Sequence, residues 1–135
     1  MSEKPKRRVK VLVAEDEEMI LQIVEFALRR QGFEVLLARN GSEAVTAAAS
    51  ERPDLVVIDM MMPVVSGYDA TRALKERPDT KGIPVLGFTA RAMQRERTLA
   101  FEAGCDDVLI KPFQIDDLFE RIHALIGDAE NQNGV

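Results

Sequence analysis

Five short apolar runs, each followed by a stretch of helical periodicity, constrain the fold of this chain more than any other feature. The apolar runs cover residues 9–14, 33–38, 55–58, 84–88 and 108–110. Apolar runs of this length predict strands that are buried on both faces. Strands that alternate with helices over short connections predict a parallel sheet with helices on both sides. Because crossovers between parallel strands are right-handed, we expect a doubly wound α/β sheet.

The expected helices end near residues that commonly terminate helices. These are Gly32 after the first helix, Pro53 after the second, Pro78 after the third and Gly104 after the fourth. The fourth helix, around residues 91–103, has a thin apolar face, which predicts weak packing. The fifth helix carries one apolar stripe, formed by Ile115, Leu118, Phe119, Ile122, Leu125 and Ile126.

Length and composition indicate one domain, which we place at residues 9–127 of the 135. Residues 1–8 are expected to form a flexible basic stub, and residues 128–135 a polar tail. The sequence has neither a membrane-spanning apolar run nor a signal-peptide core, so membrane insertion is not expected. The single cysteine, Cys105, has no partner for an internal disulfide and favours a cytoplasmic location. A net charge of −5 argues against direct nucleic-acid binding.

Polar side chains follow four of the five expected strands. Glu15 and Asp16 come after the first strand, Asp59 after the third, Thr89 after the fourth and Lys111 after the fifth. In an open parallel sheet the carboxyl ends of the strands meet at one edge, where ligands bind. We therefore expect three carboxylates, a hydroxyl and an ammonium group to lie close together.

This set of groups favours phosphoryl transfer. Neighbouring carboxylates need a compensating cation, and oxygen ligands with room for water and phosphate suit Mg²⁺. The hydroxyl of Thr89 and the ammonium of Lys111 are suited to an anion, so Asp59 is the candidate nucleophile that becomes an aspartyl phosphate. Each group also has a structural interpretation: acids at a helix N-terminus, Thr89 as an N-cap, or Lys111 in a turn. Those interpretations do not explain why all of these residues occur at the ends of strands in the same chain.

In order and spacing, four short motifs resemble the receiver domains of two-component response regulators. The motifs are Glu15-Asp16, Asp59-Met60-Met61-Met62-Pro63 with Gly67, Thr89-Ala90, and Lys111-Pro112-Phe113. The resemblance covers residues 10–126. It implies a flavodoxin-like sheet of five parallel strands in the order 2-1-3-4-5 with five helices, as in stand-alone regulators of the chemotaxis type.

The resemblance also implies a role for each site residue. Asp59 would accept a phosphoryl group from a histidine kinase or a histidine phosphotransfer protein. Mg²⁺ would be bound by Asp16, Asp59 and the main-chain carbonyl of Met61, with Glu15 reaching it through water. Thr89 and Lys111 would hold the phosphoryl oxygens, and the Lys111–Pro112 bond would be cis. Such a protein is a signalling switch that catalyses only its own phosphorylation and dephosphorylation.

Two positions depart from the commonest family pattern, and two further residues flank the site. Glu15 stands where aspartate is more usual, and Val108 stands where many members carry an aromatic residue. Met61 and Arg91 flank the site where side chains tune phosphorylation rates. Without a ring at position 108, we expect phosphorylation to act through the fourth helix and the fifth strand on an unknown downstream protein. The candidate output face comprises Arg95, Arg97, Phe101, Val108 and Phe113.

The sequence is also compatible with other functions. A phosphorelay intermediate would use the same site, and the chain would also fit the receiver part of a larger regulator with an output domain. A phosphatase that forms an aspartyl phosphate usually needs a second carboxylate two residues after the nucleophile, where this chain has Met61. A nucleotide-binding function is disfavoured because no glycine-rich loop follows the first strand.

Overall fold

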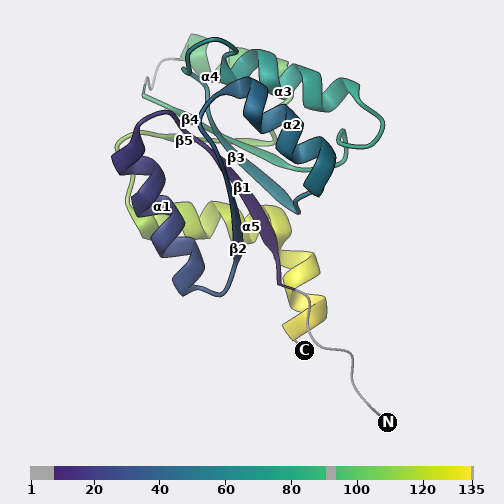
Figure 1. Cartoon of the computed structure of the whole chain (residues 1–135). Coiled ribbons are helices and arrows are strands. Elements are labelled where there is room, and N and C mark those ends of the chain that lie inside the picture. The colour runs from purple at the N-terminus through teal and green to yellow at the C-terminus, as the bar shows by residue number, and fades with distance from the viewer. Residues whose placement is uncertain (1–7, 91–93, 135) are drawn as a thin grey trace.

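The computed structural model describes residues 8–90 and 94–134, in which one sheet lies between two layers of helices (Figure 1). Strands and helices alternate throughout. Their bounds are β1 Lys10–Ala14, α1 Glu18–Arg30, β2 Glu34–Ala38, α2 Gly41–Glu51, β3 Leu55–Asp59, α3 Gly67–Glu76, β4 Val85–Thr89, α4 Gln94–Ala103, β5 Asp107–Ile110 and α5 Ile115–Gly134. All strand pairs are parallel and the strand order is β2-β1-β3-β4-β5, as expected from the sequence.

Each face of the sheet has its own hydrophobic core. Helices α1 and α5 cover one face, and α2, α3 and α4 cover the other (Figure 1). Side chains of β1 and β3 alternate between the cores: Val11 and Val57 join the α1–α5 core, and Leu12 and Val56 join the opposite one. Strands β1 and β3 are therefore buried on both faces, which explains why their sequences are continuously apolar.

The sheet register brings the carboxyl ends of the strands to one edge. Ala14 pairs with Ile58, Asp59 with Phe88, and Thr89 with Ile110. The residues that immediately follow β1 and β5 therefore lie near the ends of β3 and β4. The motifs found in the sequence converge at this edge.

The helix ends confirm the glycine signals. Gly32 and Gly104, after α1 and α4, have φ angles of 93° and 119°, the left-handed region that favours glycine. At helix starts, Asn40 accepts a hydrogen bond from the main-chain nitrogen of Glu43, and Ser66 accepts one from that of Asp69.

The C-terminal end differs from the expectation. Helix α5 continues through the segment expected to be a polar tail and ends at Gly134. Residues 128–133 contain neither proline nor glycine, so local sequence does not oppose continuation of the helix. Residues 1–7, most of the expected basic stub, lie outside the described residues. No helix in the described part of the chain has the length and hydropathy of a membrane span.

Candidate functional site

The site is built on three carboxylates at the ends of neighbouring strands. Glu15 and Asp16 follow β1, and Asp59 is the last residue of β3; their candidate ligand oxygens lie within 4.8 Å of one another. Glu15 is fully buried and Asp59 is nearly so, whereas Asp16 is exposed. The structure thus brings together the acidic residues that the sequence predicted.

Lys111 supplies the positive charge at this cluster. Its Nζ donates to Oε1 of Glu15 at 2.7 Å and to Oδ2 of Asp59 at 3.1 Å. The Lys111–Pro112 bond is cis, as predicted, and the main-chain nitrogen of Lys111 donates to the carbonyl of Thr89 at 2.7 Å. Burial alone would lower the pKa of Lys111, but its bonds to Glu15 and Asp59 outweigh burial and raise it. Lys111 is therefore a fixed cation at neutral pH.

The surplus of negative charge at the cluster affects the pKa of Glu15. Burial raises the pKa of Glu15 to about 7, against the lowering effect of its bonds from Lys111 and from the main-chain nitrogen of Glu17. The neighbouring carboxylate of Asp59 also contributes to this raised pKa. Three carboxylates share one ammonium group, so the cluster is short of positive charge when all three are ionised.

This donor set fits Mg²⁺. Magnesium prefers oxygen ligands, usually one or two carboxylates together with water and phosphate oxygens. Asp16 is open to solvent, and the buried Glu15 and Asp59 supply the remaining carboxylate oxygens beside it. A divalent cation here would neutralise the charge that Lys111 leaves uncompensated.

The backbone around Asp59 is held closely by the loop that follows. Oδ1 of Asp59 accepts a hydrogen bond from the main-chain nitrogen of Met61 at 3.0 Å. A Cβ atom at Gly67 would lie 2.2 Å from the carbonyl oxygen of Asp59, so α3 can start here only with glycine. Met60 and Met62 are buried, and Met61 is 64% exposed.

Val64, in the same loop, has a conformation that the sequence did not reveal. Its φ angle is 67°, and its side chain is 90% exposed. The left-handed region is unfavourable for a β-branched residue. The loop between Asp59 and α3 therefore contains local backbone strain next to the site.

Thr89 lies at the same edge of the sheet and is buried. It is the last residue of β4, and α4 is described only from Gln94, so its role as an N-cap stays a prediction. Arg91, expected to tune the site, lies outside the described residues.

The candidate output residues do not form a single surface. Arg95, Arg97 and Phe101 are exposed on α4. The placement of Val108 on this surface was wrong: it is 3% exposed, because β5 turns its side chain into the core beneath α4. Phe113 packs on the opposite side of the sheet, with its ring centroid 4.7 Å from that of Phe88.

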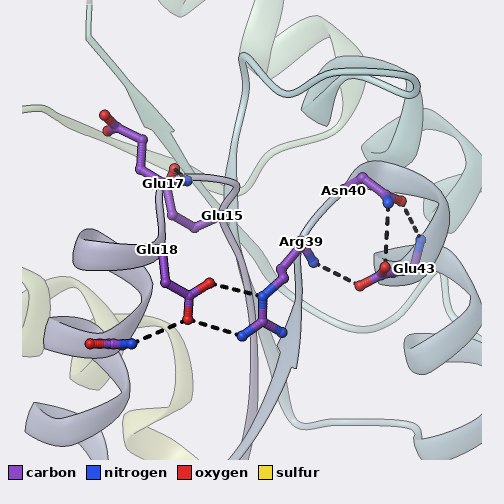
Figure 2. A network of polar contacts seen from close by, with 7 residues as sticks. Glu15, Glu17, Glu18, Arg39, Asn40 and Glu43 are labelled. Atoms are coloured by element: carbon purple, nitrogen blue, oxygen red, sulfur yellow. Dashed lines mark hydrogen bonds and ion pairs between the residues drawn. The ribbon is translucent and has the colours of Figure 1, made fainter.

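An ion pair that sequence inspection did not find lies beside the acidic segment (Figure 2). Arg39, directly after β2, donates through Nε and Nη2 to the two carboxylate oxygens of Glu18, both at 3.0 Å. Glu18 is the first residue of α1. The two residues are 21 positions apart and have no local pattern that links them.

The outer face of α1 is unusually apolar. Met19, Ile23 and Phe26 are 75%, 51% and 65% exposed. A groove beside this face runs between α1 and the segment after β5, and Lys111 and Phe113 contribute to its lining. An apolar surface thus borders the acidic site.

Comparison with known proteins identifies the family. The sequence pattern described as "Response regulator receiver domain" matches residues 11–123. The regulatory protein TcrX of Mycobacterium tuberculosis is 41% identical over 87% of this chain and 50% of TcrX. The phosphate regulon regulator PhoB of Rhizobium meliloti is 36% identical over 90% of this chain and 53% of PhoB. The chain thus spans about half the length of these two relatives.

Other relatives match along nearly their whole length. The polar-differentiation response regulator DivK of Brucella anthropi is 34% identical over 88% of this chain and 97% of DivK. The chemotaxis regulator CheY4 of Vibrio cholerae has a TM-score of 0.84 at 28% identity, covering 88% of this chain and 99% of CheY4. The receiver domain of a Pseudomonas aeruginosa sensor histidine kinase, solved with magnesium in its active-site cleft, has a TM-score of 0.84 at 32% identity, covering 90% and 99%. The chain belongs to the response regulator receiver domain family of two-component systems.

Proposed function

We propose that this chain is a phosphorylation switch in which Asp59 accepts a phosphoryl group in the presence of Mg²⁺. The observation that carries the proposal is the convergence of Glu15, Asp16 and Asp59 around a single ammonium group, that of Lys111. The three carboxylates outnumber this one ammonium group, and a divalent metal would offset the surplus negative charge and the charge of an incoming phosphoryl group.

The chemistry assigns one task to each residue. A carboxylate oxygen of Asp59 would attack phosphorus, and the bond from phosphorus to the donor's histidine nitrogen would break. Bound Mg²⁺ would neutralise charge on the phosphoryl oxygens; Asp16, Asp59 and the carbonyl of Met61 would hold it, with Glu15 acting through water. Lys111 and the hydroxyl of Thr89 would bind the phosphoryl oxygens. Water attack on the same phosphorus would later return Asp59 to its free form.

The partner that delivers the phosphoryl group would be a histidine kinase or a histidine phosphotransfer protein. Such a donor must bring its histidine to Asp59, and the apolar face of Met19, Ile23 and Phe26 offers a contact surface next to the site. We propose a cytoplasmic location and an unknown downstream protein that binds the phosphorylated form preferentially. A phosphorelay intermediate is the second candidate, since the site would be the same.

Phosphorylation with acetyl phosphate tests the proposal. With Mg²⁺, intact-mass spectrometry should detect a single added phosphoryl group, which Asp59→Asn should abolish completely. Asp79→Asn is the control, because Asp79 pairs with Arg77 in the loop before β4. Labelling that persists in Asp59→Asn, or that needs no divalent metal, would contradict the proposal.

A further inference from the structure

We propose that Arg39 is a positioning residue for metal binding: it holds the acidic segment, residues 15–18, in its ligating arrangement through its ion pair with Glu18. Arg39 itself does not belong to the cluster of candidate ligands. This role rests on the proposed function, since it concerns the same Mg²⁺ site, but it is performed by a residue that is not a candidate ligand.

The ion pair between Arg39 and Glu18 is the first contact that holds the acidic segment. Two parallel hydrogen bonds of 3.0 Å join the guanidinium of Arg39 to both carboxylate oxygens of Glu18 (Figure 2). A two-point contact between planar groups restricts orientation as well as distance. It therefore ties the first residue of α1 to the residue that follows β2.

Arg39 is itself anchored by the start of α2. Its main-chain nitrogen donates to Oε1 of Glu43 at 2.9 Å, and the main-chain nitrogen of Glu43 donates to the side chain of Asn40 at 2.8 Å (Figure 2). Together these two bonds fix the backbone from which the Arg39 side chain extends. The ion pair is thus made to a rigid support.

The acidic segment is held at both ends. At its beginning, the main-chain nitrogen of Glu15 donates to the carbonyl of Ala38 at 3.0 Å. At its end, Glu18 is held by Arg39, the next residue after Ala38. Between them, the main-chain nitrogen of Glu17 donates to Oε2 of Glu15 at 3.1 Å and orients that buried carboxylate. Asp16 lies between the two anchors.

The same turn also contacts the loop that carries Met61. The main-chain nitrogen of Gly41 donates to the carbonyl of Val65 at 3.1 Å. A Cβ atom at Gly41 would lie 2.3 Å from that oxygen, so the two backbones approach as closely as glycine permits. Residues 39–41 therefore brace both loops that would supply metal ligands.

The expected effect falls on metal binding rather than on stability. The side chains of Arg39 and Glu18 are each 51% exposed, and exposed pairs contribute little to folding. Residues that orient metal ligands, in contrast, typically change affinity by about 10- to 100-fold when they are replaced. Because this contact is exposed, we expect the lower end of that range.

Neutralising each partner separately distinguishes positioning from simple charge. Isothermal titration with Mg²⁺ would be applied to the full chain carrying Glu18→Gln or Arg39→Gln. If Arg39 positions the segment, both variants should bind Mg²⁺ about tenfold more weakly. If only through-space charge mattered, Arg39→Gln would bind Mg²⁺ more tightly than the wild type, because it removes a positive charge near the site. Unchanged or tighter binding by Arg39→Gln would overturn the inference.

Three further measurements complete the test. The exchanged pair Glu18→Arg with Arg39→Glu should restore affinity, because it rebuilds the contact at the same net charge. Arg77→Gln, which removes a matched two-point pair with Asp79 elsewhere on the surface, should bind Mg²⁺ like the wild type. In metal-free protein, amide exchange of residues 16–18 should be faster in both single variants but not in Arg77→Gln. If the wild-type protein binds no Mg²⁺, both the proposed function and this inference are overturned. If the wild type binds Mg²⁺ and Arg39→Gln binds it with the same affinity, only this inference is overturned.

Discussion

Two lysines, one at each end of the sheet, serve as a natural comparison. Lys111 lies at the carboxyl ends of the strands, where its Nζ contacts Glu15 and Asp59. Lys75 lies near the opposite end, where its Nζ contacts the carbonyl of Ile83 at 2.9 Å and Oδ2 of Asp106 at 3.1 Å. Their side chains have similar exposure, 14% for Lys111 and 22% for Lys75.

The two lysines differ in the balance of charge around them. Lys75 faces one nearby carboxylate, and Oδ2 of Asp106 also accepts from the main-chain nitrogen of Val85 at 2.8 Å. One ammonium group is therefore matched by one carboxylate around Lys75. Lys111 faces three clustered carboxylates, of which Glu15 has a pKa raised to about 7 by burial. A partly buried lysine thus has a purely structural role where one carboxylate balances its charge. Where several carboxylates surround it, the remaining negative charge can bind a cation.

The largest expected difference concerns phosphorylation. Lys111→Met should slow phosphorylation of Asp59 by acetyl phosphate about 100-fold, as is typical when a group that stabilises transition-state charge is removed. Lys75→Met should change the rate by less than about twofold, because its bonds do not reach the site. Time courses by intact-mass spectrometry measure both. A comparable loss in the two variants would mean that the comparison reflects general stability.

A smaller effect, of opposite sign at the two ends, is expected for stability without metal. Asp59→Asn should raise the free energy of unfolding by about 1 kcal/mol, because it relieves repulsion within the acidic cluster. Asp106→Asn should lower it by about 1 kcal/mol, because it breaks a balanced ion pair that is partly exposed. Urea unfolding at pH 8 with EDTA measures both. Shifts in the same direction would show that charge balance does not distinguish the two ends.

A further effect on stability concerns the pH dependence of Glu15. Its pKa is raised from 4.5 to about 7 in the fold, so its protonated form stabilises the fold at acidic pH, and this contribution is lost as the pH rises through 7. Glu15→Gln should therefore gain stability over the metal-free wild type between pH 5 and pH 8, by on the order of 1 kcal/mol.

Urea unfolding of Glu15→Gln and wild type at both pH values measures this gain. The control is Glu102→Gln, an exposed position on α4, which should show no such pH-dependent difference. An equal stability difference at the two pH values would mean that Glu15 does not titrate in this range.

Much of the fold and the ligand set could be predicted from the sequence. Continuous apolar runs identify strands buried on both faces, and parallel strands must end at one edge. A polar residue that directly follows such a strand is therefore expected to lie near the polar residues that follow the other strands. This reasoning correctly gathered Glu15, Asp16, Asp59 and Lys111.

The remaining features depend on tertiary geometry. The contact of Glu18 with Arg39 joins two exposed charges on different elements, and sequence periodicity carries no information about such pairs. Val108 was assigned to the output face because the fifth strand was expected to act together with the fourth helix, but α4 covers the face of β5 that carries this side chain. The length of α5 depended on the absence of a stop signal, which is weaker than the presence of one.

Val64 has a further consequence at the level of the gene. Its left-handed backbone costs on the order of 1–3 kcal/mol for a β-branched residue, and its side chain is almost fully exposed. Valine and glycine codons differ only at their second base, so a single nucleotide substitution would replace the strained residue with one that tolerates this conformation. A single point mutation at this position of the loop can therefore change local stability without altering any of the candidate ligands.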